Sequence, residues 1–132
     1  MPVVDASVLV TYLVGGEAAD VRERLLSVRE WWWAPHLVDA EVGHVLRRAT
    51  ANGELTVPRA AAALADLGGL PLRRAAHVGL LERAWALRHN LSFYDALYVA
   101  LAERLEMPLL TLDRHLAGAP RLRVDVEILG SG

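Results

Sequence analysis

Apolar and polar residues follow one another along the chain in a pattern that predicts short buried strands alternating with amphipathic helices. Short apolar or alternating stretches of strand length occupy residues 2–5, 31–34, 109–112 and 124–129. Apolar residues spaced three or four positions apart predict helices over residues 6–14, 17–29, 36–52, 58–67, 77–89 and 92–106, and a helical turn over 114–117. This alternation indicates an α/β fold built from βαβ units around a parallel sheet.

Glycine and proline mark the ends of several of these segments. Gly15-Gly16 and Gly68-Gly69 each follow a predicted helix, Asn52-Gly53 is a turn signal, and Pro108 ends the helix that begins near Ser92. Residues 70–72 are interpreted as a short extended link between two helices.

The composition is that of a folded chain with a sizeable core. The chain has 132 residues, of which 54% are hydrophobic, and is expected to form a single domain over residues 1–132. No run of about 18 apolar residues predicts a membrane span, and no basic region precedes the first apolar stretch as in a signal peptide. The absence of cysteine excludes disulfides and thiolate metal sites. We therefore expect a cytoplasmic protein.

The basic residues are of one kind. All fourteen are arginine, and the formal net charge is −2. Arginine suits phosphate recognition because its planar fork binds two oxygens at once. A coding bias of the source is the simpler explanation for the absence of lysine, but the absence still excludes any mechanism that needs a lysine.

Four acidic residues occupy positions where a charge requires a reason: Asp5, Glu41, Asp95 and Asp113. Asp5 and Asp113 follow predicted strands, at the edge where open α/β sheets bind ligands. Glu41 and Asp95 lie on the apolar faces of predicted helices, where an unpaired charge is costly. Carboxylates gathered in one crevice repel one another, and a hard cation such as Mg²⁺ or Mn²⁺ relieves the repulsion. The chemistry that this suggests is hydrolysis of a phosphodiester by a metal-activated water.

Each acid also has a purely structural explanation. Asp5 and Asp113 are each followed by a helical segment and are suitable N-caps. Ser92 and Asp95 form a pattern similar to a capping box. Glu41 is able to pair with an arginine. Taken singly, these explanations are about as good as the functional one, but four such coincidences are less probable than a shared site.

Other polar residues near the acids are candidates for supporting roles. The hydroxyls of Ser7 and Thr111, each two residues from an aspartate, are placed to orient carboxylates. Tyr94, beside Asp95, is a candidate substrate contact or a cover for the helix start, and Arg47 and Arg114 are further candidate substrate contacts.

Histidine and tryptophan give weaker signals. The five histidines show no metal-ligand spacing, so we expect structural or surface roles for them. Trp31, Trp32 and Trp33 are interpreted as a strand in or near the core; a subunit interface or a base-stacking surface is the alternative.

Four short motifs occur in a fixed order across the chain: Asp5-Ala-Ser-Val-Leu, Glu41 within DAEVGHVL, Tyr94-Asp95-Ala-Leu-Tyr and Thr111-Leu-Asp113. In their order, spacing and placement on strands and helices, they resemble PIN-domain nucleases, and most of all the small VapC-type toxins of bacterial toxin–antitoxin pairs. The resemblance extends over nearly all 132 residues.

The resemblance implies a three-layer α/β/α sandwich around a parallel sheet, with a metal site. It implies Mg²⁺ or Mn²⁺ bound by Asp5, Glu41, Asp95 and Asp113, with Ser7 and Thr111 in support. One departure is His44, at a position where relatives often have asparagine.

The activity that the resemblance implies is that of an endoribonuclease acting on a structured RNA, often a tRNA or rRNA. The same resemblance implies a homodimer that is silenced by a small cognate antitoxin.

Several other functions were considered. A phosphoacceptor receiver domain requires a lysine near its last strands, and this chain has none. A dehalogenase-like phosphatase requires a second acid two residues after Asp5, where Ser7 stands. A PIN-like module that only binds, and a PIN nuclease of RNA processing outside any toxin system, remain open alternatives.

Overall fold

A parallel sheet of five strands runs through the centre of the protein, in the order β3-β2-β1-β4-β5. The computed structural model describes residues 1–16 and 18–130. The strands are β1 (Val3–Val4), β2 (Trp32–Pro35), β3 (Leu72–Ala75), β4 (Leu109–Thr111) and β5 (Val126–Ile128). All four strand pairings are parallel. The first strand of the chain is therefore the middle strand of the sheet, and the residues after β1 and β4 emerge side by side.

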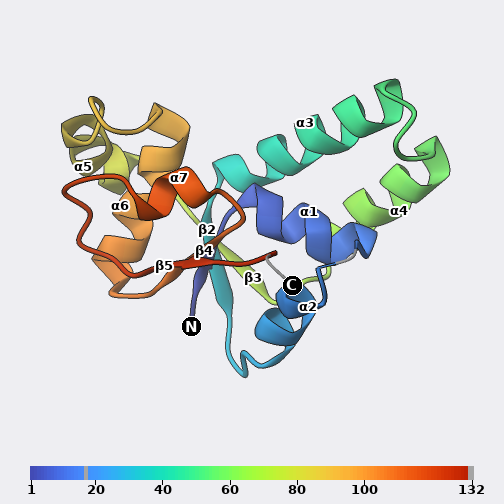
Figure 1. Ribbon diagram of the computed structural model, residues 1–132, viewed down its shortest axis with the longest axis horizontal. Helices are drawn as coiled ribbons and strands as arrows, with labels where there is room; N and C mark the ends of the chain where they lie inside the picture. Colours follow the sequence, from blue (N-terminus) through green and yellow to red (C-terminus); the bar gives the residue numbers. More distant parts are fainter. Residues whose placement is uncertain (17, 131–132) are drawn as a thin grey trace.

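Helices cover both faces of this sheet. They are α1 (Ala6–Val14), α2 (Ala19–Leu26), α3 (Leu37–Ala51), α4 (Val57–Leu67), the 3₁₀ turn η1 (Val78–Leu80), α5 (Leu81–Ala86), α6 (Phe93–Leu105) and α7 (Arg114–Ala117). Helix α6 packs against β1, β2 and β4, with α5 beside it, whereas α1 packs against β4 and carries α2, α3 and α4. Figure 1 shows α5, α6 and α7 on one side of the sheet and α1, α3 and α4 on the other. The predicted three-layer α/β/α arrangement is confirmed.

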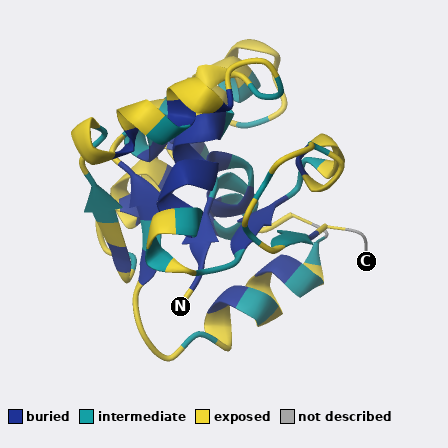
Figure 2. Ribbon diagram, turned by 90° about the vertical axis from the view of Figure 1, so that its left-hand side faces the viewer, coloured by how far each residue is buried: buried dark blue, intermediate teal, exposed yellow. Residues whose placement is uncertain are grey.

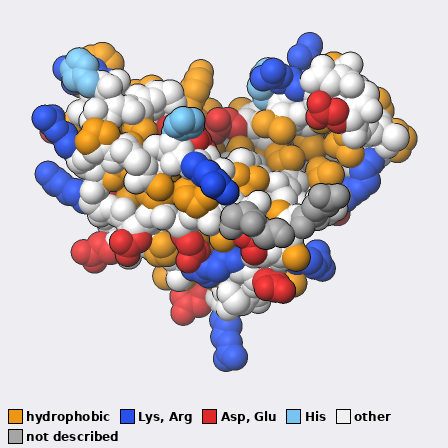
Figure 3. Space-filling view, viewed as in Figure 1, with side chains coloured by type: hydrophobic (Ala, Val, Ile, Leu, Met, Phe, Trp, Pro, Cys, Tyr) orange, Lys and Arg blue, Asp and Glu red, His pale blue; other side chains and the backbone are white. Residues whose placement is uncertain are grey.

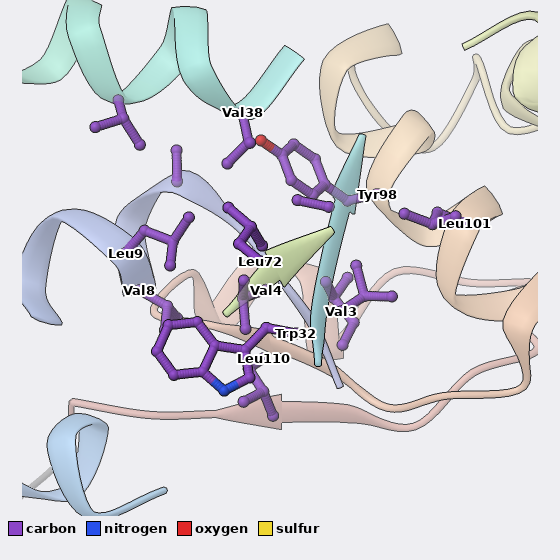
Figure 4. Close-up of a cluster of buried hydrophobic side chains, with 14 of the residues drawn as sticks. Val3, Val4, Val8, Leu9, Trp32, Val38, Leu72, Tyr98, Leu101 and Leu110 are labelled. Atoms are coloured by element: carbon purple, nitrogen blue, oxygen red, sulfur yellow. The ribbon is translucent and has the colours of Figure 1, made fainter. Parts of the chain in front are cut away.

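The core lies where the strands meet α1 and α6. Val3, Val4, Leu109 and Leu110 of the central strands have no exposed surface, because helices cover both of their faces. In Figure 2 the central strands are mainly buried, whereas the edge strands β3 and β5 are partly exposed. Figure 4 shows side chains from the strands, α1, α3 and α6 meeting in one cluster. Each fully buried valine or leucine contributes about 1.5–3 kcal/mol to folding, so this core fixes the strand ends firmly.

The prediction for residues 70–72 was wrong. The segment continues into strand β3, which pairs with β2 along its whole length. The strand sequence Leu-Arg-Arg-Ala has no apolar pattern, so periodicity did not predict a strand here. Its two arginines are accommodated because each has a partner elsewhere in the chain. The Arg73 guanidinium lies 4.5 Å from the centre of the Trp31 ring, and Arg74 pairs with Asp39.

The helices predicted over residues 77–89 and 17–29 are shorter than expected. Between 77 and 89 the chain forms η1 and then α5, which ends at Ala86. Leu80, Ala84 and Leu87 are buried at helical spacing, so the sequence pattern continues where the helix does not. Helix α2 spans only Ala19–Leu26, and Glu17 lies outside the described residues.

Within the described part of the chain, no helix is both long enough and apolar enough to span a bilayer.

Candidate active site

All four predicted acids line one pocket of about 820 Å³, at the edge of the sheet where the strands end. Asp5 follows β1 and Asp113 lies two residues beyond β4, because neighbouring parallel strands end at the same edge. Glu41 comes from the second turn of α3, and Asp95 from the first turn of α6. Figure 3 shows acidic side chains in the hollow between the two groups of helices. The sheet and the two helices therefore bring together residues that are far apart in sequence.

Asp5 is the most firmly held of the four. One of its carboxylate oxygens accepts hydrogen bonds from the Ser7 hydroxyl at 2.6 Å and the Val8 amide at 3.1 Å. Its other oxygen accepts a hydrogen bond from the Thr111 hydroxyl of β4. Burial raises the pKa of the Asp5 carboxyl, although these hydrogen bonds lower it in part. Ser7 and Thr111 therefore orient the Asp5 carboxylate, and their support of a metal site stays a prediction.

Glu41 is held by a residue that the sequence analysis did not single out. The Tyr98 hydroxyl on α6 donates a hydrogen bond of 2.6 Å to a Glu41 carboxylate oxygen. Tyr98 is 2% exposed, and Figure 4 shows its hydroxyl directed toward the first turn of α3. Burial and the hydrogen bond to Glu41 raise the pKa of Tyr98, so it stays a donor. One signal could have indicated this contact: a buried tyrosine hydroxyl usually requires a hydrogen-bond partner.

The alternative in which Glu41 pairs with an arginine is wrong. Across residues 1–16 and 18–130, the ion pairs join Arg24 to Glu127, Arg74 to Asp39 and Arg83 to Glu103, and none involves a pocket acid.

The helix-cap explanations for Asp5 and Asp113 are correct, and they are compatible with a shared pocket. Asp5 caps α1 through the Val8 amide, and Asp113 caps α7 by accepting from the His115 amide at 2.9 Å. Asp95 has its amide capped by the Ser92 hydroxyl at 3.1 Å, which leaves the aspartate side chain to line the pocket.

The carboxylates also act on one another. Burial is the largest cause of the raised pKa of Asp5, Glu41 and Asp95, and neighbouring charges add to it. The Asp95 charge raises the pKa of Asp5 and Glu41, and the Asp113 charge raises the pKa of Asp95. The pocket therefore concentrates negative charge without compensating it.

Of the remaining candidates, only Tyr94 lines the pocket. Its side chain is 60% exposed. Arg47 and Arg114 are both exposed and are absent from the pocket lining, so their role as substrate contacts stays a prediction. Among the described residues that line the pocket, His44 is the single basic side chain.

The tryptophans fall into different environments. Trp32 is 2% exposed in the core, as the strand interpretation predicted, whereas Trp31 is 43% exposed. Arg73 covers the Trp31 ring.

The donor chemistry of the pocket suits a hard divalent cation. Its acidic oxygens are those that Mg²⁺ and Mn²⁺ prefer, and a cation would relieve the repulsion described above. No three acidic or histidine side chains in the described part of the chain are arranged to hold a metal ion. In this structure the Ser7 and Thr111 hydroxyls donate to the two Asp5 oxygens, and the Tyr98 hydroxyl donates to one Glu41 oxygen. The residues therefore fit such an ion by type and charge, with the side chains turned to protein partners.

Comparison with known protein families identifies the family of this chain. The family model of the PIN domain matches residues 3–122. The chain belongs to the PIN-domain family. Within this family it groups with the VapC ribonucleases. Ribonuclease VapC1 of Mycobacterium tuberculosis is 48% identical over 128 residues, which cover 96% of each chain. Ribonuclease VapC9 of the same organism is 38% identical over 129 residues, covering 98% of each chain. The resemblance noted in the sequence is confirmed.

Solved structures agree with this PIN-domain assignment at the level of the fold. VapC20 of Mycobacterium tuberculosis, described as a Sarcin-Ricin loop cleaving toxin, has a TM-score of 0.68 at 22% identity, covering 89% of this chain and 95% of that one. VapBC2 from Rickettsia felis, bound to a DNA fragment from its promoter, has a TM-score of 0.71 at 13% identity, covering 98% of each chain.

Proposed function

We propose that this PIN domain is a metal-dependent endoribonuclease, the toxic member of a type II toxin–antitoxin pair. The observation that carries the proposal is a pocket lined by four acids and no arginine or lysine, in which burial and mutual repulsion raise the pKa of three of them. The 48% identity to a chain named as a ribonuclease supports RNA as the substrate.

In this proposal, Asp5, Glu41, Asp95 and Asp113 together hold Mg²⁺, or Mn²⁺ in its place. The bound ion supplies an activated water and neutralises charge on the phosphate that is cleaved. The protein contributes orientation: Ser7 and Thr111 hold Asp5, and Tyr98 holds Glu41. These partners matter because residues that orient metal ligands typically affect metal affinity or activity by about 10–100-fold.

The substrate is proposed to enter along the hollow between α3 and α6. Tyr94 offers an exposed ring beside Asp95 for stacking on a base. His44 lies on α3, one turn beyond Glu41, and offers a ring N–H to a phosphate oxygen. Arg47 and Arg114 lie outside the pocket and serve in this proposal as contacts for the flanking RNA backbone. A structured RNA of the tRNA or rRNA class is the proposed target.

The proposed partners are a second copy of the chain and a small antitoxin. Two of the structural neighbours support the antitoxin: one is VapBC2 from Rickettsia felis, and the other is a toxin–antitoxin complex from Klebsiella pneumoniae.

The test is cleavage of total cellular RNA by purified protein free of antitoxin, with Mg²⁺, Mn²⁺ or EDTA. Discrete fragments that depend on metal are expected, and the Asp95→Asn variant should not produce them, because it loses ligand charge at nearly constant volume. Asp66→Asn, at an exposed position of α4, is the matched control and should cleave normally.

Cleavage by Asp95→Asn at the normal rate would remove Asp95 from the site. A folded protein that neither cleaves RNA nor binds Mn²⁺ would favour the non-catalytic binding module instead.

A further inference from the structure

The helix that carries Glu41 begins without a cap of its own. Helix α3 starts at Leu37, and the preceding residue, His36, has helical backbone angles and a side chain that makes no capping hydrogen bond. The first amide groups of a helix have no partner within it and require one from elsewhere. For α3 the partner comes from residues that follow β3.

His77 supplies the missing acceptor. The Leu37 amide donates a hydrogen bond of 2.9 Å to Nε2 of His77, which lies 40 residues further along the chain. A ring nitrogen that accepts a hydrogen bond carries no proton, so the contact assigns His77 as a neutral imidazole with its proton on Nδ1. In Figure 1 the chain that leaves β3 toward α5 passes the start of α3.

Strand β3 itself holds the same helical turn. Arg74 of β3 binds both carboxylate oxygens of Asp39, at 2.7 and 2.8 Å. The His36 amide donates to the Ala75 carbonyl at 2.9 Å. Strand β3, which the sequence analysis did not predict, therefore anchors the first turn of α3 through backbone and guanidinium groups, and the residue two positions beyond it adds the imidazole.

This anchor lies next to the candidate site. Leu37 and Glu41 are one helical turn apart, and both line the acidic pocket. A small rotation of the first turn of α3 would move the Glu41 carboxylate relative to the Tyr98 hydroxyl that holds it.

We propose that His77 is a positioning residue of the site, whose neutral imidazole sets the start of α3 and thereby the orientation of Glu41. It contacts neither metal nor substrate. For its effect on metal binding the inference rests on the proposed function, but the contact itself is testable without metal.

The first measurement is made on the metal-free protein. The ¹⁵N chemical shifts of the His77 ring identify which nitrogen carries the proton, and Nδ1–H is expected. The Glu41 carboxyl ¹³C signal should shift in His77→Ala and return in His77→Gln, because the glutamine carbonyl accepts a hydrogen bond at about the reach of Nε2. A proton on Nε2, or a Glu41 signal that His77→Ala leaves unmoved, would overturn the inference.

The second measurement is Mn²⁺ affinity by calorimetry. His77→Ala should weaken binding by roughly 10-fold, as loss of a group that orients a ligand does, and His77→Gln should restore it. His89→Ala is the matched control, since this exposed histidine lies outside the pocket, and it should bind normally.

A double variant separates positioning from general damage. With Glu41→Gln already present, His77→Ala should weaken Mn²⁺ binding no further, because the two residues act on one ligand. An equal further loss would mean that His77 acts independently of Glu41, and it would overturn the inference.

If the unmodified protein bound no Mn²⁺, the proposed function would fail while the NMR result still decided the role of His77. If His77→Ala did not fold, the ring shifts of the unmodified protein and the behaviour of His77→Gln would decide it.

Discussion

Two pockets of similar volume in the described part of the chain contain acidic side chains, and the surroundings of these acids differ. The pocket where the strands end measures about 820 Å³ and is lined by the four candidate site acids. The other measures about 930 Å³ and lies where β4 and β5 begin, between α5, α6 and residues 122–125. The two pockets therefore have similar volumes, and they differ in whether the charge of their acids is compensated.

In the second pocket the charge of Glu103 is compensated. Glu103 accepts two hydrogen bonds from the Arg83 guanidinium, at 2.6 and 3.1 Å, and one from the Arg123 amide at 2.9 Å. Burial by itself raises the pKa of Glu103, but these donors outweigh it and lower the pKa overall. At Asp5, Glu41 and Asp95, burial prevails and the pKa is raised. Uncompensated charge therefore distinguishes a site poised to bind a cation from an ion pair that stabilises the fold.

The largest effects are expected when one acid in each pocket is neutralised, and these two variants test whether the pockets differ in function. Glu41→Gln should lower metal-dependent cleavage roughly 100-fold with little loss of stability, since it removes a charge that its neighbours repel. Glu103→Gln should leave cleavage unchanged but lower the free energy of unfolding by about 1.5–3 kcal/mol, because it leaves Arg83 without its carboxylate. Initial cleavage rates and urea denaturation measure the two effects. Loss of cleavage in a fully stable Glu103→Gln would contradict the distinction.

A smaller effect is expected when the partner of a pocket acid is removed. Tyr98→Phe deletes the hydroxyl that donates to Glu41 and should reduce cleavage about 10-fold. The hydrogen bond lowers the pKa of Glu41, so its loss raises that pKa further and moves the acidic limb of the pH–rate profile to higher pH. Tyr12→Phe, outside the pocket and packed against Trp32, should change neither quantity.

The smallest effect concerns the stability of the metal-free protein. Folded-state pKa values above 3.8 for Asp5 and Asp95 and above 4.5 for Glu41 mean that the folded protein binds these protons more tightly than the unfolded chain. Their contribution to stability therefore grows as pH falls from neutral toward these values. Glu103 contributes with the opposite sign, since the stability from its lowered pKa is lost as pH falls.

Thermal unfolding of the unmodified protein and of Glu41→Gln, each at about pH 7 and about pH 5.5, isolates the contribution of Glu41. On acidification, the change in melting temperature should be less favourable for the variant than for the unmodified protein. Mg²⁺ at neutral pH should stabilise the unmodified protein by mass action and Glu41→Gln less. Identical pH dependence in the two proteins would show that Glu41 carries no uncompensated charge.

The sequence predicted the assembly of the pocket acids but not the contacts that hold them. Asp5 and Asp113 were predictable because parallel strands end at one edge, and Glu41 and Asp95 because their helical spacing set them among apolar residues. Tyr98, Arg74 and His77 act on partners 57, 35 and 40 residues away. Local periodicity and capping chemistry concern residues that are close in sequence, so they do not predict hydrogen bonds between residues this far apart. For the same reason strand β3, whose arginines find their partners on other elements, was not predicted.

The central position of β1 in the sheet has a consequence for the synthesis of the protein. Asp5 is synthesised well before the Thr111 hydroxyl that holds it, which lies 106 residues later in the chain, and Asp113 is later still. Any chain that has not reached Asp113, because it is still growing or because it ends early at a stop codon, lacks part of the acidic set. Under the proposed function, a growing chain therefore cannot cleave RNA until Asp113 has been added and β4 has paired with β1.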